Sequence, residues 1–201
     1  MLKEYKTIIL EEQNSAGVLK LNRPNKLNAF NMQMLDDMLD AIDQVNKNDN
    51  IKSLIVTGSG RAFCAGADLS LGEKTFDKSF DTKAKYESDF RRDAGGILSL
   101  KIYNSLKPVI AACNGDAVGV GATMQLPADI RIASSKSRFG FVFAKRGIVP
   151  DGCASWFLPK IIGIPMALEL CYSGKIIDAS DALKIGLINY LVDESELMKK
   201  A

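Results

Sequence analysis

The chain of 201 residues contains no histidine. Without an imidazole, this sequence cannot build the Ser-His-Asp or Cys-His arrangements of nucleophilic enzymes. Acid–base chemistry that depends on histidine is excluded in the same way. Any proton transfer at a catalytic site must therefore use Asp, Glu, Lys, Tyr or Cys.

Cysteine is scarce, and no two cysteines are spaced as C-x-x-C. The four are Cys64, Cys113, Cys153 and Cys171. Because histidine is absent, a zinc site would have to be built from cysteines and carboxylates alone. We expect free thiols, buried or half-buried, in a reducing compartment.

The sequence also lacks a strong charge bias and a long apolar run. Its 26 basic and 24 acidic residues give a net charge of +2, which argues against a nucleic-acid-binding protein. No segment approaches the roughly 20 apolar residues of a membrane span. The first residues, MLKEYKTIILEEQ, lack the apolar centre of a signal peptide. We expect a cytoplasmic protein that does not bind a membrane.

What is present is the composition of a folded protein. Hydrophobic residues make up 47% of the chain and charged residues 25%, which is ordinary for a globular domain. A chain of this length buries roughly 70% of its unfolded surface, so it needs neither disulfides nor a structural metal. We expect a single domain over residues 1–201.

Strand and helix signals alternate along the chain, which predicts a parallel α/β architecture. Strands are predicted over residues 7–11 and 18–21, which form a hairpin, and over 52–57, 108–112, 130–133 and 187–192. One helix is predicted from the N-cap Asn31 to residue 47, and a second one follows the polar segment 70–92 and ends at residue 106. Further helices are predicted over residues 122–126, 152–162, 165–172 and 178–186, the last with Asp178 as its N-cap. Residues 70–92 should form a mobile polar loop that leads into a helix, and residues 139–147 an irregular segment.

Two glycine-rich turns each follow a predicted strand. The first is Ala65-Gly66-Ala67-Asp68, and the second runs from Asn114 to Gly121. Because sites in α/β sheets form at the carboxyl ends of strands, the two turns are placed to share one site. Small residues allow a ligand close to the main chain, and a following helix presents free N–H groups. Taken alone, the first turn would equally suit a tight structural role.

The second turn is not a nucleotide-binding motif. No Gly-Lys-Ser/Thr follows it, and Gly119-Val120-Gly121 lacks the third glycine and the acidic residue of a dinucleotide fingerprint. A helix N-terminus with exposed N–H groups remains, and such a group suits an oxyanion.

Six motifs, in order and at matching spacing, resemble the crotonase superfamily of enoyl-CoA hydratases and isomerases. They begin at Asn22-Arg23-Pro24 and continue to Ala182…Gly186-Leu187-Ile188, by way of residues 61–69, 107–111, 114–115 and 128–133. The resemblance implies a crotonase-like spiral of ββα units, with the C-terminal helical region largely absent, through truncation or as a natural variant. It also implies a homotrimer or a dimer of trimers.

The same resemblance implies an acyl-CoA thioester as substrate and no separate cofactor, since coenzyme A is part of the substrate. The backbone N–H groups of Ala67 and Val120 would hold the enolate oxygen that forms when a proton leaves the carbon beside the thioester. The residues matched to binding of CoA or the acyl chain are Lys26, Leu27, Ala29, Ala65, Asp68, Leu69, Gly119, Thr123 and Phe143.

The resemblance weakens at the acids of the hydratases. Those enzymes activate one water with two glutamates, and the matching positions here are Thr123 and Phe143. Asp151, by contrast, matches the single acid/base of the Δ3,Δ2-enoyl-CoA isomerases. Burial among Phe141, Phe143, Trp156 and Phe157 would raise its pKa toward the working range. An isomerase is therefore the favoured activity, with a hydratase or a non-catalytic acyl-CoA-binding protein as alternatives.

Asp151 has a competing interpretation, the N-cap of the helix that follows it. Aspartate is also shorter than the glutamate common in isomerases, which suggests weak activity or another substrate, such as an aryl or epoxide CoA ester. Glu73 and Asp116 are poorer acid/base candidates and are expected at the surface. We expect Lys145 and Arg146 to be solvated or to face the CoA phosphates.

Overall fold

The structure is a computed structural model that describes residues 4–76 and 93–201. The side chains of residues 71, 73, 74 and 76 lie outside this description. Most of the loop expected over residues 70–92 therefore falls outside the described residues, as does the side chain of Glu73.

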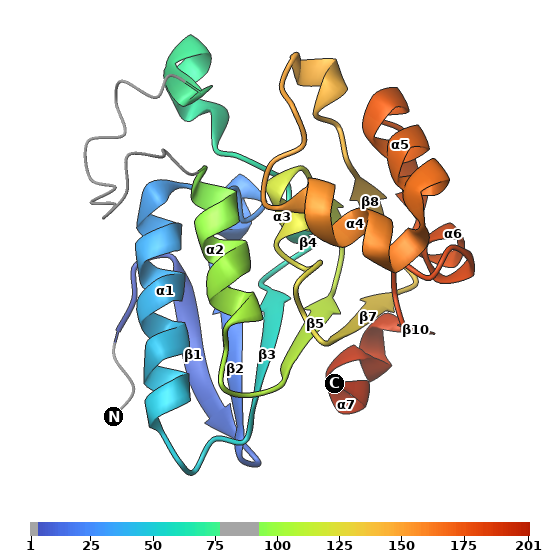
Figure 1. Cartoon of the computed structure of the whole chain (residues 1–201). Coiled ribbons are helices and arrows are strands. Elements are labelled where there is room, and N and C mark those ends of the chain that lie inside the picture. Colours follow the sequence, from blue (N-terminus) through green and yellow to red (C-terminus); the bar gives the residue numbers. More distant parts are fainter. Residues whose placement is uncertain (1–3, 77–92) are drawn as a thin grey trace.

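A six-stranded sheet forms the centre of the molecule (Figure 1). Its strands, in spatial order, are β1 (Ile8–Gln13), β2 (Ala16–Leu21), β3 (Ser53–Gly58), β5 (Val109–Cys113), β7 (Ile130–Ser134) and β10 (Tyr190–Val192). Only β1 runs antiparallel to its neighbour. The β1–β2 turn places Asn14 and Ser15 at φ 49° and 64°, as a two-residue hairpin requires, so the predicted hairpin is confirmed.

A second sheet is built from four short strands, in the order β4 (Ala62–Cys64), β6 (Asp116–Val118), β8 (Arg138–Gly140) and β9 (Ile176–Asp178). Strands β4, β6 and β8 each follow a strand of the large sheet, and a helical segment follows each of them in turn. This repeated strand–strand–helix order confirms the expected spiral of ββα units. The prediction of an irregular segment from residue 139 was wrong at its start, because β8 pairs with β6 and β9 there.

Helices α1 (Met32–Lys47) and α2 (Ala94–Tyr103) lie side by side against the large sheet (Figure 1). The Asn31 side chain caps α1 by accepting a hydrogen bond of 2.9 Å from Met34 N, as predicted. The expected apolar stripe of α1 is buried, with Leu35, Met38, Ile42 and Val45 at most 2% exposed. Helix α2 ends three residues earlier than predicted, at Tyr103.

The remaining helices lie around the short sheet, except the last one, which forms the end of the chain and packs against β5 and β7 of the large sheet. They are α3 (Val120–Thr123), α4 (Ala154–Ile162), α5 (Ile164–Ser173), α6 (Ala179–Lys184) and α7 (Leu197–Lys200), with 3-10 turns η1 (Pro24–Lys26), η2 (Leu69–Phe76), η4 (Ala144–Arg146) and η5 (Glu194–Glu196). Asp178 caps α6 by accepting from Asp181 N at 2.8 Å, which confirms that prediction.

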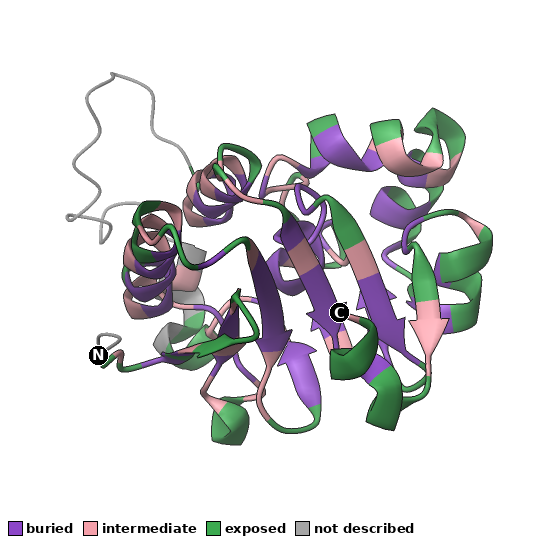
Figure 2. Ribbon diagram, turned by 90° about the horizontal axis from the view of Figure 1, so that it is seen from below, coloured by how far each residue is buried: buried purple, intermediate pink, exposed green. Residues whose placement is uncertain are grey.

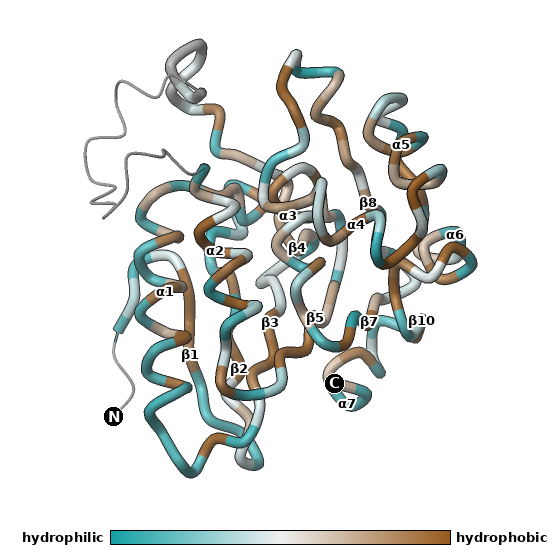
Figure 3. Tube along the Cα trace, viewed as in Figure 1, coloured by the Kyte–Doolittle hydropathy of each residue, from teal (hydrophilic) through white to brown (hydrophobic). Residues whose placement is uncertain are grey.

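The core lies between the large sheet and the helices. Buried residues fill the central strands in Figure 2, and the apolar stretches of the same strands stand out in Figure 3. The predicted state of the thiols is confirmed, since Cys64, Cys113 and Cys171 are buried and Cys153 is partly exposed, all unbridged. Across the described ranges, no helix is both long and apolar enough to cross a bilayer.

Candidate active site

The two glycine-rich turns lie directly against each other. Strand β4 leads into the first turn and pairs in parallel with β6, which leads into the second. A Cβ atom added to Gly121 would lie 2.1 Å from the Cys64 carbonyl oxygen, and one added to Gly66 would lie 3.2 Å from the Val118 oxygen. The close approach needs glycine at both positions, and it brings the turns together as predicted.

The backbone N–H groups of Ala67 and Val120 are both available. Phe30 and Ala67 form a parallel bridge in which Phe30 N donates to Gly66 O and Asp68 N donates to Phe30 O, each at 2.8 Å. In this pattern the N–H of the bridged residue, Ala67, points to the other side. Val120 is the first residue of α3, where an N–H has no acceptor within the helix. Neither N–H donates to another described residue.

The segment matched to CoA binding runs beside the first turn. Ala65 N donates to Leu27 O at 3.0 Å, and Arg23 forms an ion pair of 2.7 Å with Asp68 while also donating to Ala29 O. Asn28 is fully buried, and its amide donates to the carbonyls of Ser59 and Ala62 at 2.9 and 2.8 Å. The matched residues from Leu27 to Asp68 are thus brought together.

The exposed members of the matched set lie at its edge. Lys26 and Leu69 face solvent, and Leu69 is 46% exposed. The Asp68 carboxylate is occupied by Arg23 and by Ser70 N. Burial acts to raise the pKa of Asp68, but its hydrogen bonds to Ser70 and Arg23 outweigh burial and leave the pKa below its usual value.

Asp151 lies in the turn before α4, next to α3. The next residue, Gly152, packs so closely on α3 that an added Cβ would lie 2.3 Å from Thr123 Oγ1. The Asp151 Oδ1 atom is buried and has no hydrogen-bond partner among the described residues. Cys153, with φ 58°, is the residue that precedes α4, and no side chain caps this helix. The interpretation of Asp151 as an N-cap is therefore wrong.

Burial, and secondly the nearby Asp93, raise the pKa of Asp151 to about 7. A carboxyl group with such a pKa exists in both protonation states near neutral pH. It can take up and release a proton at similar cost, which is what acid–base catalysis requires.

The raised pKa has a consequence for stability. The folded protein holds the Asp151 proton up to about pH 7, whereas an unfolded chain releases it near the ordinary value of 3.8. The free energy of unfolding should therefore fall as the pH rises between these values and stay level above them. Asp151→Asn removes this loss, so the stability of the variant relative to wild type should increase by about 2 kcal/mol from pH 5 to pH 8. Urea denaturation at the two pH values measures the difference.

A matched control for this experiment is Asp116→Asn. Asp116 forms an ion pair with Arg138, and the hydrogen bond from Arg138 lowers its pKa, so its contribution should not change across the same pH interval. An Asp151→Asn difference that is equal at both pH values would contradict the burial argument.

Positions 123 and 143 are both filled by packing. Thr123 is fully buried against Gly152, and Phe143 is 2% exposed. The Phe143 carbonyl accepts from Arg146 N at 2.9 Å and Ile148 N at 3.2 Å, which anchors the segment before Asp151.

A family model described as enoyl-CoA hydratase/isomerase matches residues 11–201. The chain belongs to this family. Enoyl-CoA hydratase ACTT3 of Alternaria alternata is 40% identical over 182 residues, covering 90% of this chain and 59% of that protein. The chain thus spans less than two thirds of that relative's length.

Two further comparisons agree with the family. The 1,2-epoxyphenylacetyl-CoA isomerase of Escherichia coli strain K12 is 35% identical, over 96% of this chain and 72% of that protein. A crystal structure described as enoyl-CoA hydratase subunit I, from Geobacillus kaustophilus HTA426, superposes with a TM-score of 0.86 at 29% identity, over 98% of this chain and 73% of that one.

The other residues considered in the sequence analysis lie partly or fully at the surface. Asp116 is a partly exposed ion-pair partner of Arg138, and Lys145 and Arg146 are exposed on η4, as expected. Trp156 is 60% exposed, and the Lys160 Nζ atom lies over its ring, 4.2 Å from the ring centroid. The expectation that Trp156 helps bury Asp151 was therefore wrong, because its position on α4 faces outward.

Asp93 was not among the predicted site residues, yet its side chain contacts Gly152, the residue after Asp151. Asp93 Oδ1 accepts hydrogen bonds from Gly96 N at 2.6 Å and from Gly152 N at 3.1 Å. An aspartate directly before an apolar helical run is a signal for an N-cap, and that signal was available. The second bond spans 59 positions, and nothing in the local sequence indicates it.

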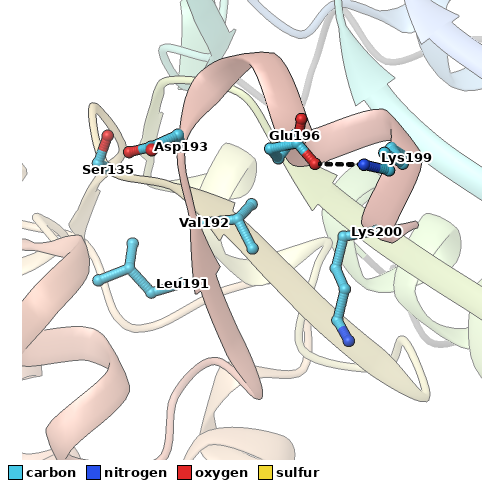
Figure 4. A pocket seen from close by; sticks show the side chains of 7 residues that line it. All are labelled: Ser135, Leu191, Val192, Asp193, Glu196, Lys199 and Lys200. Atoms are coloured by element: carbon cyan, nitrogen blue, oxygen red, sulfur yellow. Dashed lines mark hydrogen bonds and ion pairs between the residues drawn. The ribbon is translucent and has the colours of Figure 1, made fainter.

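A groove of about 610 Å³ lies elsewhere, between β10 and the end of the chain (Figure 4). It is lined by Ser135, Leu191, Val192, Asp193, Glu196, Lys199 and Lys200. Its charges are mixed, and Lys199 is paired with Glu196 at 3.0 Å. None of the predicted site residues lines this groove. Among the residues that the structure covers, no group of three or more Cys, Asp or Glu side chains is placed to hold a metal ion.

Proposed function

We propose that this chain is the catalytic part of an enzyme that moves a double bond in an enoyl-CoA thioester, with Asp151 as the single acid/base. The observation that carries the proposal is the Oδ1 atom of the Asp151 carboxyl, which lies beside α3, is buried, and has no hydrogen-bond partner among the described residues. Such an orphaned group is costly to keep in a folded protein, which favours a functional reason for it.

The proposed reaction needs only one base and one oxyanion site. The Asp151 carboxylate takes a proton from C2 of a 3-enoyl thioester, and the electron pair of that C–H bond moves toward the thioester oxygen. The N–H groups of Ala67 and Val120 hold the resulting negative charge on that oxygen. Asp151 then returns the same proton to C4, which leaves the double bond conjugated with the thioester. The pKa of Asp151, about 7, suits both transfers near neutral pH.

The packing of Thr123 supports a single-acid mechanism over water addition. Thr123 Oγ1 lies so near Gly152 that a Cβ added to this glycine would come within 2.3 Å of it, which leaves little room on that side for a longer acidic side chain. Phe143 contributes a buried apolar ring at the other position that matches a hydratase acid. With both positions occupied in this way, neither of them supplies a carboxylate that could hold a water.

Hydration of an enoyl-CoA is the second candidate function. It is favoured by the description of the ACTT3 relative as an enoyl-CoA hydratase. The description of another relative as a 1,2-epoxyphenylacetyl-CoA isomerase supports a broader range of esters, which fits the shorter aspartate. In each case the same residues are proposed to bind the CoA or the acyl chain: Lys26, Leu27, Ala29, Ala65, Asp68, Leu69, Gly119, Thr123 and Phe143.

The wild-type protein can be tested with two substrates. We expect a 3-enoyl-CoA to gain the ultraviolet absorbance of a conjugated thioester at a higher rate than crotonyl-CoA loses it in water. Rapid hydration of crotonyl-CoA would overturn this order. If calorimetry shows that the protein binds both esters, but neither of them nor an epoxide CoA ester is turned over, the protein is a non-catalytic acyl-CoA-binding protein. Analytical ultracentrifugation tests the proposed trimer or dimer of trimers.

A further inference from the structure

We propose that Asp93 is a positioning residue for Asp151: from the start of α2, its carboxylate anchors the Gly152 peptide and sets the electrostatic environment of the neighbouring acid/base. This inference rests on the role proposed for Asp151. Asp93 would fix the position of Asp151 without contacting the substrate.

Side chains from α2 and its N-cap bind both backbone groups of Gly152. Asp93 Oδ1 accepts from Gly152 N at 3.1 Å, and the Ser99 hydroxyl donates to Gly152 O at 2.8 Å. Ser99 is fully buried, so its bond is shielded from water. The residue after Asp151 is therefore fixed to a helix that precedes it by more than 50 positions in the sequence.

Packing leaves this peptide little room to move. A Cβ on Gly95 would lie 3.3 Å from Gly152 Cα and 3.1 Å from Val120 Cγ2, and one on Gly152 would meet Thr123 at 2.3 Å. Gly152 is thus enclosed between α2 and α3, with φ 61°. A shift of the Asp93 anchor should be passed to Asp151 rather than absorbed by the turn.

Helix capping alone does not explain Asp93. Its bond to Gly96 N, at 2.6 Å, is the ordinary N-cap bond of α2. The bond to Gly152 N uses the same oxygen and contributes nothing to the helix end. One carboxylate therefore joins the helix start to the turn that carries Asp151.

Asp93 is also the charged group whose electrostatic repulsion affects Asp151, among the segments that pack around it. After burial, the Asp93 carboxylate is the cause that raises the pKa of Asp151. Helix α3 carries no ionisable residue, Lys101 of α2 pairs with Asp43, and Lys145 and Arg146 of η4 are exposed. On α4, Lys160 lies over Trp156, and Cys153 precedes the helix.

The decisive variant is Asp93→Asn. Asparagine caps helices as well as aspartate does and retains an oxygen that accepts from Gly96 and Gly152, but it carries no charge. We expect a folded protein of similar thermal stability and a measurably lower pKa of Asp151, because the neighbouring negative charge is gone. The pH at which the isomerisation rate rises should move down by the same amount, because the base ionises earlier. Asp93→Ala, which also loses the anchor, should lower kcat by about 10- to 100-fold with a smaller change in KM.

Carbon-13 NMR of labelled aspartate carboxyls measures the Asp151 titration directly, with the signal assigned by its loss in Asp151→Asn. Asp178→Asn is the matched control, since Asp178 caps α6 by the same type of bond, and it should leave the Asp151 titration unchanged. An Asp151 titration and pH profile unmoved in Asp93→Asn would overturn the inference, even if Asp151→Asn is inactive. Full activity in Asp151→Asn would instead overturn the proposed function, and the NMR titration would still report on Asp93.

Discussion

Replacing Asp151 with asparagine should reduce the rate of double-bond isomerisation by about 10²- to 10⁴-fold, the usual contribution of a positioned acid/base. Asparagine has nearly the same shape but can neither take nor return the proton. The chain contains no histidine, and Thr123 and Phe143 offer no carboxylate that could replace Asp151. Steady-state kinetics with a 3-enoyl-CoA, with conjugation followed by absorbance, measures the loss.

The loss should fall on kcat rather than on binding. The proposed contacts to CoA and to the thioester oxygen come from other residues, so the calorimetric affinity for a saturated acyl-CoA should stay within a few-fold of wild type. Because the stability of the variant relative to wild type is expected to rise toward pH 8, the kinetics are measured at that pH, with urea denaturation as the check that the variant is folded. Activity equal to wild type would reject Asp151 as the proton carrier.

Gly121→Ala is expected to destabilise the protein by about 3 kcal/mol and to remove most acyl-CoA binding. The new Cβ would lie 2.1 Å from the Cys64 carbonyl oxygen and 2.8 Å from Cys64 Cβ. Cys64 is fully buried and its strand β4 pairs with β6, so its main chain cannot move without separating the two turns. Separation would pull the N–H groups of Ala67 and Val120 apart. Chemical denaturation and calorimetry with an acyl-CoA measure the two effects.

Gly147→Ala serves as the control for this substitution. Gly147 has φ 66° and no atom within 4 Å of an added Cβ, so it reports the cost of backbone strain without a clash. That cost is about 1 kcal/mol, and acyl-CoA binding should be retained. If Gly121→Ala is no more harmful than Gly147→Ala, the close approach of the turns does not support the site.

Local signals predicted much of the fold. The apolar positions of α1 and the cap at Asn31 lie within a few residues of one another, so the chain reveals them before it folds. The same holds for Asp178 and for the β1–β2 hairpin. Strands β8 and β9 have three residues each, too few to show a period, and they exist because each pairs with a distant partner.

The sequence by itself determined the two glycine-rich turns, the absence of histidine and of acids at positions 123 and 143, and Asp151 as the candidate proton carrier. Only the tertiary structure decided that the Asp151 Oδ1 atom is buried without a partner among the described residues, that Trp156 faces solvent, and that Asp93 accepts a hydrogen bond from Gly152 N. The physical reason is distance along the chain. The desolvation of the Asp151 carboxyl and the hydrogen bond between Asp93 and Gly152, 59 positions apart, depend on which segments pack together. The residues adjacent to Asp151 and Asp93 in the sequence do not indicate that packing.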